Sequence, residues 1–446
     1  MKLSLLGLLL WFAVGVQAQV GPTVPSQESP GIHRAGPSSV DVGDYIYISG
    51  QGPRGADGAL PATFAAQVRQ ALNSLKSVVE TAGLTIDHVV YTTVYLTDIS
   101  QYGEMNSVFA GYFGETPPAR AVLGVAGLPD PPIEINAVVV RSLSDRRAVY
   151  PSNYKSDEPF SPGILTHDRL FVSAMPANVP GGGKVSDDPA TQVDFALDRM
   201  KAVMEAAGLD LGHMVFVNPY LTARMPTRIM NEHYARRFEF GNTPARATIE
   251  VSSLPGGAQI EFTGVAVREL EKRRTVRPKN MPPSPTASPC VFAGDTLYCS
   301  AKSGFIPGPN GGVYTSTTAL QLRQTMRNLL DNLEEADMNF EQVVSTNVYL
   351  DNLADVREFD DVYAKYFHGR LPARTTIQQI ASGERNSDKE GRYPDLEQVS
   401  FIAVRNSPGH YVTWIQPPGS LFNASAKATL PRGDVAQGQI PQPSRH

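Results

Sequence analysis

The chain has 446 residues, which suggests three domains at about 150 residues each, and its 41% hydrophobic and 19% charged content is ordinary for a globular protein. A net charge of −5 excludes the overall positive field that attracts nucleic acid or anionic membranes. Two cysteines and eight scattered histidines exclude zinc fingers, iron–sulfur proteins and disulfide-dense miniproteins.

The N-terminus has the pattern of a secretory signal peptide. Lys2 supplies the positive charge, residues 3–14 form an apolar core, and Ala18 is a small residue suited to cleavage. The alternative, an uncleaved membrane anchor, requires about 20 apolar residues, and this core is shorter. We therefore expect residues 1–18 to be a signal peptide and the mature protein to be exported, periplasmic or secreted, without membrane attachment after cleavage.

The rest of the chain repeats one pattern three times. Each copy contains an apolar strand that ends in Tyr-Leu, a short helix, the tripeptide Pro-Ala-Arg and a closing strand that ends in Val-Arg. The Pro-Ala-Arg arginines are Arg120, Arg246 and Arg374, spaced by 126 and 128 residues. Periods this long indicate tandem domains, because solenoid repeats run about 20 to 50 residues.

Within each copy the hydrophobic period predicts the order β-β-α-β-α-β-β. Alternating residues predict the opening hairpin and the later strands, and three- and four-residue steps predict the long helix. We place the domains at residues 31–141, 158–268 and 284–405, joined by charged, proline-bearing linkers and followed by a polar, partly disordered tail at 406–446.

The helices leave one face of each sheet without cover. A sheet with both helices on one face must bury the other face against something. Three tandem copies can do this by closing their exposed faces on one another about a pseudo-threefold axis.

The segment Ile48-Ser49-Gly50-Gln51, the Pro-Ala-Arg strand and the closing Ile-Glu-Ile strand occur in an order that resembles the RidA (YjgF-like, reactive intermediate deaminase) family. All three copies show this resemblance. Because family members are homotrimers with ligand clefts between subunits, it implies an α+β fold of three chorismate-mutase-like domains in a single-chain pseudo-trimer. It also implies hydrolysis of small 2-imino and 2-enamino acids to 2-keto acids and ammonia, with no metal and no other cofactor.

The same resemblance implies which residues form the clefts. An arginine would hold the substrate carboxylate through two parallel hydrogen bonds, and a glutamate would move the proton of the attacking water. The implied catalytic residues are Arg120 and Glu134 in the first copy and Arg246 and Glu261 in the second. The implied ligand-binding residues are Ser49, Gly50, Asn106, Ser173, Asn231 and Arg374.

The third copy departs from this pattern. Gln398 stands where the first two copies have Glu134 and Glu261, and Asp360 stands where they have Asn106 and Asn231. An insert at 381–395 also lengthens a turn expected beside the cleft. Because a glutamine cannot accept a proton, we expect the cleft of Arg374 either to bind ligand without turnover or to have lost its function.

Two alternatives remain open from the sequence. The three arginines could instead be structural, each pairing with a carboxylate across a domain interface, and shared ancestry alone would preserve them. The whole protein could likewise be a carboxylate-binding or protein-interaction module without turnover. The expected partner is a small carboxylate-bearing imine or enamine and not nucleic acid, because no basic, aromatic-interleaved stripe accompanies the acidic charge balance.

The two cysteines flank the opening hairpin of the third copy. With a two-residue turn at Gly294-Asp295, Cys290 and Cys299 lie directly opposite each other. In an oxidising compartment this geometry predicts a structural disulfide. The alternative is two buried free thiols, which a slipped turn would produce.

Overall fold

The computed structural model describes residues 36–152, 154, 158–175, 186–308, 311–368, 370–405 and 413–415, all within one compact unit, His33–His446. The predicted signal peptide and most of the polar tail lie outside the described residues.

The first domain has a six-stranded sheet in the order β19-β1-β2-β5-β3-β4. Its elements are β1 (Ser39–Asp41), β2 (Tyr45–Gln51), α1 (Phe64–Thr81), β3 (Val89–Leu96), α2 (Tyr102–Phe109), β4 (Ala119–Gly124) and β5 (Ile133–Val140), completed by β19 (Thr413–Ile415).

The second domain has a seven-stranded sheet in the order β10-β9-β12-β8-β7-β6, with β11 also paired to β9. Its elements are β6 (Arg147–Val149), β7 (Gly163–Leu165), β8 (Arg169–Val172), α3 (Pro189–Ala206), β9 (Met214–Leu221), α4 (Thr227–Ala235), β10 (Ala245–Arg246), β11 (Ile249–Glu250) and β12 (Ile260–Val267).

The third domain has a six-stranded sheet in the order β13-β14-β15-β18-β16-β17. Its elements are β13 (Arg273–Val276), β14 (Cys290–Ala293), β15 (Thr296–Ser303), α5 (Thr318–Glu335), β16 (Val343–Leu350), α6 (Val356–Tyr363), β17 (Ala373–Gln378) and β18 (Glu397–Val404).

The segment after each domain adds a strand to the next sheet. The linkers form β6 and β13, which pair with β7 and β14, and β19 returns from the C-terminal segment to pair with β1. The three domains are therefore linked in a closed ring by backbone pairing.

The long helices begin and end at residues suited to those positions. Thr63, Asp188 and Thr317 each accept a hydrogen bond from a backbone N–H of the first turn through their side chains. Gly83 follows α1 with a φ of +76°, and Asp337 takes the same left-handed conformation after α5 with a φ of +56°.

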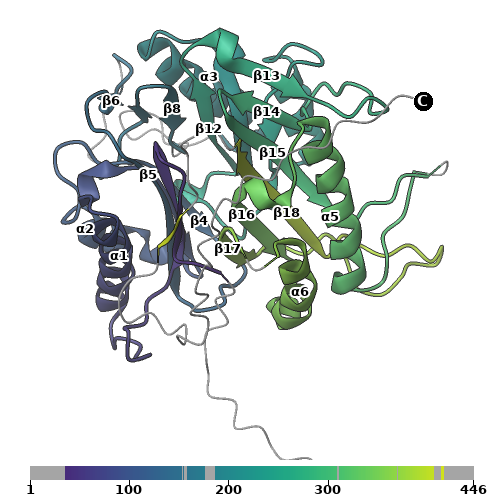
Figure 1. Cartoon of the computed structure of the whole chain (residues 1–446), viewed down its shortest axis with the longest axis horizontal. Helices are drawn as coiled ribbons and strands as arrows, with labels where there is room; N and C mark the ends of the chain where they lie inside the picture. Colours follow the sequence, from purple (N-terminus) through teal and green to yellow (C-terminus); the bar gives the residue numbers. More distant parts are fainter. Residues whose placement is uncertain are drawn as a thin grey trace, which may run out of the picture. The chain divides into compact units, whose positions relative to one another are not determined.

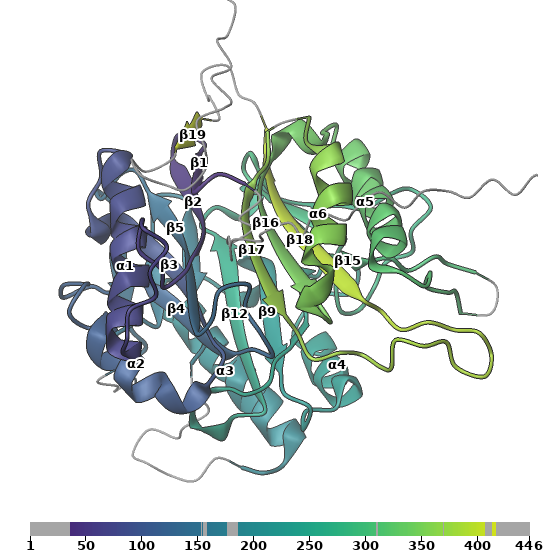
Figure 2. The same cartoon turned by 90° about the horizontal axis from the view of Figure 1, so that it is seen from below.

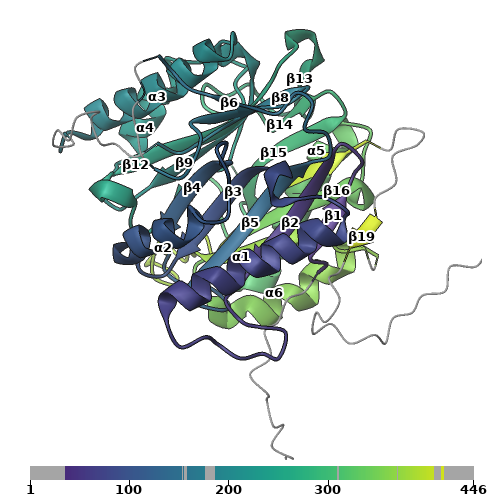
Figure 3. The ribbon, with the colours of Figure 1, turned by 90° about the vertical axis from the view of Figure 1, so that its left-hand side faces the viewer.

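The helices lie on the outside and the three sheets face one another inside (Figures 1, 2 and 3). Each domain has its own buried core between its helices and its sheet. A further buried cluster joins the opposite faces of all three sheets, and its aromatic members are Tyr95, Phe216, Tyr220, Tyr298 and Tyr349. The predicted α+β single-chain pseudo-trimer is thus confirmed.

Two features are absent from the described residues. None of their helices combines the length and the apolar character needed to cross a bilayer. The same residues contain no group of three or more His, Cys, Asp or Glu side chains that could hold a metal ion.

The opening hairpin of the third domain contains a disulfide. Cys290 on β14 and Cys299 on β15 are directly opposed in the register and are bonded to each other, with their Cα atoms 4.1 Å apart. Both cysteines are fully buried beneath α5 in the core of this domain.

Candidate active site

The three clefts lie where each Pro-Ala-Arg strand packs against the next domain. Strand β4 contacts β8, β10 contacts β15, and β17 contacts β2. The arginine backbone N–H groups donate to serine Oγ atoms in the pairs Arg120–Ser173 (2.8 Å), Arg246–Ser300 (2.8 Å) and Arg374–Ser49 (3.0 Å). The arginine of each domain therefore belongs with the serine of the following domain and not with the serine of its own copy.

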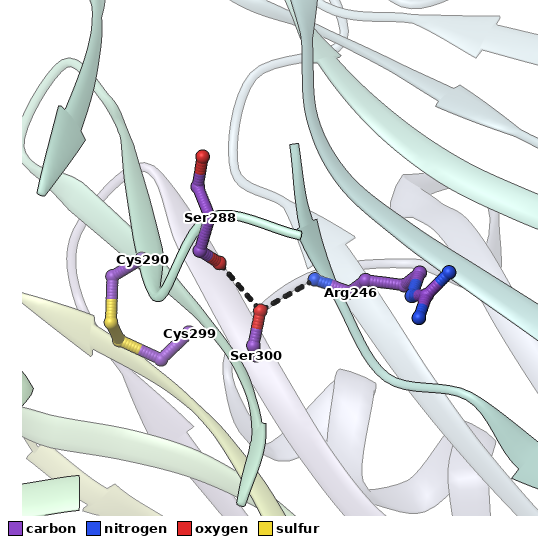
Figure 4. The surroundings of a disulfide bond; sticks show 5 residues. All are labelled: Arg246, Ser288, Cys290, Cys299 and Ser300. Carbon is purple, nitrogen blue, oxygen red and sulfur yellow. Dashed lines mark hydrogen bonds between the residues drawn. A yellow bond between two sulfur atoms is a disulfide. The ribbon is translucent and has the colours of Figure 1, made fainter. Parts of the chain in front are cut away.

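Each of these serines is itself fixed by a second hydrogen bond. Its hydroxyl donates to a backbone carbonyl twelve residues earlier in the chain, at a distance of 2.6 Å in all three domains. Figure 4 shows this arrangement for Ser300, between the carbonyl of Ser288 and the N–H of Arg246 and close to the disulfide.

The expected pairing of Arg120 with Glu134 in one cleft is wrong. Arg120 is registered with Thr92 of β3, whereas Glu134 is registered with Tyr95 of the same strand. Because these partners are three residues apart, the two side chains point to opposite faces of the sheet. The same offset separates the arginine from its expected partner in the other two domains.

The arginine meets the glutamate position of the following domain instead. Arg120 and Glu261 line one cavity, between domains 1 and 2. Arg246 and Gln398 line another, between domains 2 and 3. The cleft that lacks a proton acceptor at this position is therefore the cleft of Arg246, and the expectation that it is the cleft of Arg374 is wrong.

Glu134 of domain 1 lies beside the third cleft, because domain 1 follows domain 3 in the ring. A Cβ atom on Gly50 would lie 1.7 Å from Glu134 Oε1, so only a glycine leaves space for this carboxylate. Gly50 follows Ser49, which binds the backbone of Arg374. Glu134 thus lies on the domain 1 side of the cleft of Arg374.

Arg120 is the most completely buried of the three arginines. Its side chain is 1% exposed and packs on the rings of Tyr102, Phe109 and Phe160, with the guanidinium carbon 5.9, 4.6 and 5.2 Å from their centroids. Within the described residues, neither Nη1 nor Nη2 of this fork has a hydrogen-bond acceptor. A buried, unsatisfied guanidinium is costly, which favours binding of an anion beside it.

A carboxylate of the protein already occupies this place. Glu158, at the start of domain 2, accepts hydrogen bonds through Oε2 from Tyr102 Oη (2.8 Å) and Asn106 Nδ2 (2.6 Å), and lies 3.9 Å from Arg120 Nη2. The cavity that remains is only about 10 Å³. The predicted residue Asn106 is therefore part of a carboxylate-binding site, and Glu158 fills that site.

Glu261 is a buried acid on the other side of Arg120. Its side chain is almost fully buried, and among the described residues its Oε1 has no hydrogen-bond partner. Burial raises the pKa of Glu261 to about 8, against the opposing effect of Arg199 and Arg120. At neutral pH it therefore keeps its proton and can act as a general acid.

This raised pKa predicts how stability depends on pH. Between pH 4.5 and about pH 8 the unfolded chain has lost the Glu261 proton while the folded chain keeps it, so the free energy of unfolding falls as pH rises. Glu261→Gln removes the titrating group and with it this fall in the free energy of unfolding. The difference in melting temperature, variant minus wild type, should increase from pH 5 to pH 8, whereas Glu205→Gln on the exposed side of α3 should give a constant difference. A constant difference for Glu261→Gln would contradict the raised pKa.

The cleft of Arg246 is open, and no acidic side chain of the described residues forms an ion pair with its arginine. Arg246 Nη1 donates to Asn231 Oδ1 at 2.7 Å, and its guanidinium carbon lies 5.3 Å from the centroid of the Tyr234 ring. The cavity beside it measures about 380 Å³. Asn231 thus holds the arginine side chain in place, and its predicted contact with a ligand stays a prediction.

The cleft of Arg374 is neutralised from within its own domain. Arg374 Nη1 lies 2.6 Å from Asp360 Oδ1, and both side chains are largely buried. The alternative left open in the sequence analysis was a carboxylate across a domain interface, whereas this carboxylate comes from the same domain as the arginine. Here an aspartate replaces the asparagine of the other two clefts.

The long turn of domain 3, between β17 and β18, extends outward beyond the sheet of its own domain (Figure 2). Arg385 forms ion pairs with Asp351 and Asp355. At the base of the turn, the N–H of Ile380 donates a hydrogen bond to the carbonyl of Glu250 in domain 2.

Comparison with known proteins agrees with the three-domain architecture. A family model described as "Endoribonuclease L-PSP" matches residues 33–141, 151–268 and 280–382. The chain is 39% identical over 124 residues to the 2-iminobutanoate/2-iminopropanoate deaminase of Escherichia coli (strain K12), covering 27% of this chain and 97% of that protein. It is 37% identical over 106 residues to the RutC family protein PH0854 of Pyrococcus horikoshii, covering 23% and 84%. The crystal structure of the YjgF gene product from E. coli matches with 42% identity over 24% of this chain and 87% of that chain, with a TM-score of 0.23.

Proposed function

The chain belongs to the endoribonuclease L-PSP (RidA/YjgF) family, and on this premise we propose that it hydrolyses small 2-imino or 2-enamino acids to 2-keto acids and ammonia in the cleft between domains 1 and 2. One observation supports this choice of cleft. The buried fork of Arg120, which has no hydrogen-bond acceptor among the described residues, and the buried acid Glu261 line the same cavity.

In this proposal Arg120 binds the substrate carboxylate in the place that Glu158 fills. The donors Tyr102 Oη and Asn106 Nδ2, which bind Glu158, would bind the substrate in the same way. Exchange of one carboxylate for another keeps the buried guanidinium paired throughout.

Glu261 would move the protons of the reaction. Protonated Glu261 donates its proton to the imine nitrogen, which gives an electrophilic iminium carbon. The Glu261 carboxylate then accepts a proton from the water that adds to this carbon. It returns that proton to the nitrogen, the carbon–nitrogen bond breaks, and loss of the hydroxyl proton to Glu261 forms the keto group and restores the acid as ammonia leaves.

The experiment generates 2-iminopropanoate in situ and follows its disappearance with and without protein. We expect the wild type to accelerate hydrolysis well above the buffer rate, and Arg120→Ala to lose this acceleration. Hydrolysis by the wild type at the buffer rate would reject the proposal.

A second candidate function is binding of a carboxylate ligand without turnover. It is favoured by one observation, that the open cleft of Arg246 offers Gln398 in place of a proton acceptor. Wild type that binds a small carboxylate but shows no hydrolysis would support this candidate over the first.

We also propose that the protein acts after export. The Cys290–Cys299 disulfide supports an oxidising compartment, because disulfides are rare in the reducing cytosol. The mass of the protein isolated from its source should correspond to cleavage after Ala18, and a full-length chain in the cytosol would contradict the proposal.

A further inference from the structure

The open cleft between domains 2 and 3 contains two cationic side chains, Arg246 and Lys302. None of the residues that line this cavity of about 380 Å³, all of them in the described part of the chain, is acidic. Neither cation forms an ion pair with any described residue. The cleft therefore has an unbalanced positive charge.

Lys302 distinguishes this cleft from the other two. It lies two residues after Ser300, and the corresponding positions after Ser49 and Ser173 are Gln51 and Met175. Lys302 is partly buried, and burial lowers the pKa of its ammonium group without a carboxylate to oppose the shift. A cation held in this way is stabilised when an anion binds beside it.

The cleft is open because the residues that fill the first cleft are replaced. Ser161 and Ser288 occupy equivalent places. The carbonyl of each accepts a hydrogen bond from the serine hydroxyl twelve residues later, that of Ser173 or Ser300. Counting back from this pair, Pro285 stands in the place of Glu158, and Ala287 in the place of the ring of Phe160. The start of domain 3 thus supplies no carboxylate to Arg246.

Gln398 adds to this preference for anions. An ionised glutamate in this position would repel a second negative charge, whereas a glutamine carries no charge at any pH. The amide of Gln398 instead offers an N–H donor, whose only hydrogen bond in the described residues is a long one of 3.5 Å to Gln379.

We propose that this cleft binds a small dicarboxylate, with one carboxylate at Arg246 and the other at Lys302. The guanidinium fork binds the first carboxylate in a bidentate manner, and the ammonium group binds the second as a point charge. This inference does not depend on hydrolysis in the cleft of Arg120.

Calorimetry with succinate and propionate tests the proposal. We expect the wild type to bind succinate at least about tenfold more tightly than propionate, because only succinate can reach both cations. Lys302→Met, which introduces the residue of domain 2, should reduce this preference to near unity. Lys302→Arg should preserve it, and Lys201→Met, which removes an exposed charge from α3, should leave it unchanged.

Two results would overturn the proposal. One is equal affinity of the wild type for succinate and propionate, and the other is a succinate preference that persists in folded Lys302→Met. If Lys302→Met does not fold, Lys302→Gln introduces the residue of domain 1 and is measured in the same way. A series from malonate to glutarate would then show which chain length spans the two cations.

Discussion

Glu261→Gln is expected to lower kcat for 2-iminopropanoate hydrolysis by about 100-fold or more, because general acid–base catalysis contributes at least this factor. KM should change little, since Arg120, Tyr102 and Asn106 still bind the carboxylate. Glutamine has nearly the same size and shape as glutamate, so the loss would report the missing proton and not a cavity.

Glu134→Gln provides the matched control. It makes the same chemical change at the equivalent position of domain 1, but Glu134 lies beside the cleft of Arg374, whose guanidinium is already paired with Asp360. We expect at least half of the wild-type activity to remain. A large loss in Glu134→Gln with little loss in Glu261→Gln would place the reaction in the cleft of Arg374 instead.

Glu158→Ala is expected to raise kcat/KM by about 10-fold or more. Substrate must displace the Glu158 carboxylate from Tyr102, Asn106 and Arg120, and hydrogen bonds to a charged group contribute about 1.5–3 kcal/mol each. Removal of the competing side chain lowers this cost. The effect should appear mainly in KM, because Glu158 takes no part in the proton transfers.

Steady-state kinetics of Glu158→Ala and of Glu205→Ala, an exposed glutamate of α3, measure this effect. The Glu205 variant should match the wild type. A lower kcat/KM in folded Glu158→Ala would show that Glu158 helps to bind substrate, and the idea of competition would have to be abandoned.

The fold could be predicted from the sequence because its signals are local and repeated. The three- and four-residue steps of Val193, Leu197 and Met200 place them on the buried face of α3. The turn at Gly294-Asp295 correctly places Cys290 opposite Cys299. The helix and strand patterns recur in three copies, which makes a chance pattern easy to recognise.

The composition of the clefts could not be predicted in the same way. Arg120 and Glu134 are close in sequence, but whether they share a cleft depends on the face to which each points and on which domain follows in the ring. Counting alternate residues along β3, from the partner of Arg120 to the partner of Glu134, shows that the two side chains lie on opposite faces of the sheet. No local signal gives the order of three similar domains around an axis.

The role of Glu158 was missed for a different reason. It is the first residue of the second domain, at a boundary to which the sequence analysis assigned no functional role. The contrast between Glu158 and Phe160 at the start of domain 2 and Pro285 and Ala287 at the start of domain 3 is visible in the sequence. Only the hydrogen bonds of Ser161 and Ser288 establish that these positions are equivalent.

The closed ring has a consequence for how such a protein can change over evolutionary time. In a homotrimer encoded by one short gene, every substitution is copied into all three sites at once. In this fused chain a substitution alters one site, so Lys302, Asp360 and Glu158 could each arise without any cost to the neighbouring sites. The second domain contributes Arg246 to one cleft and Glu261 to another. Because each repeat supplies residues to two sites, no single repeat can be exchanged without altering both of them.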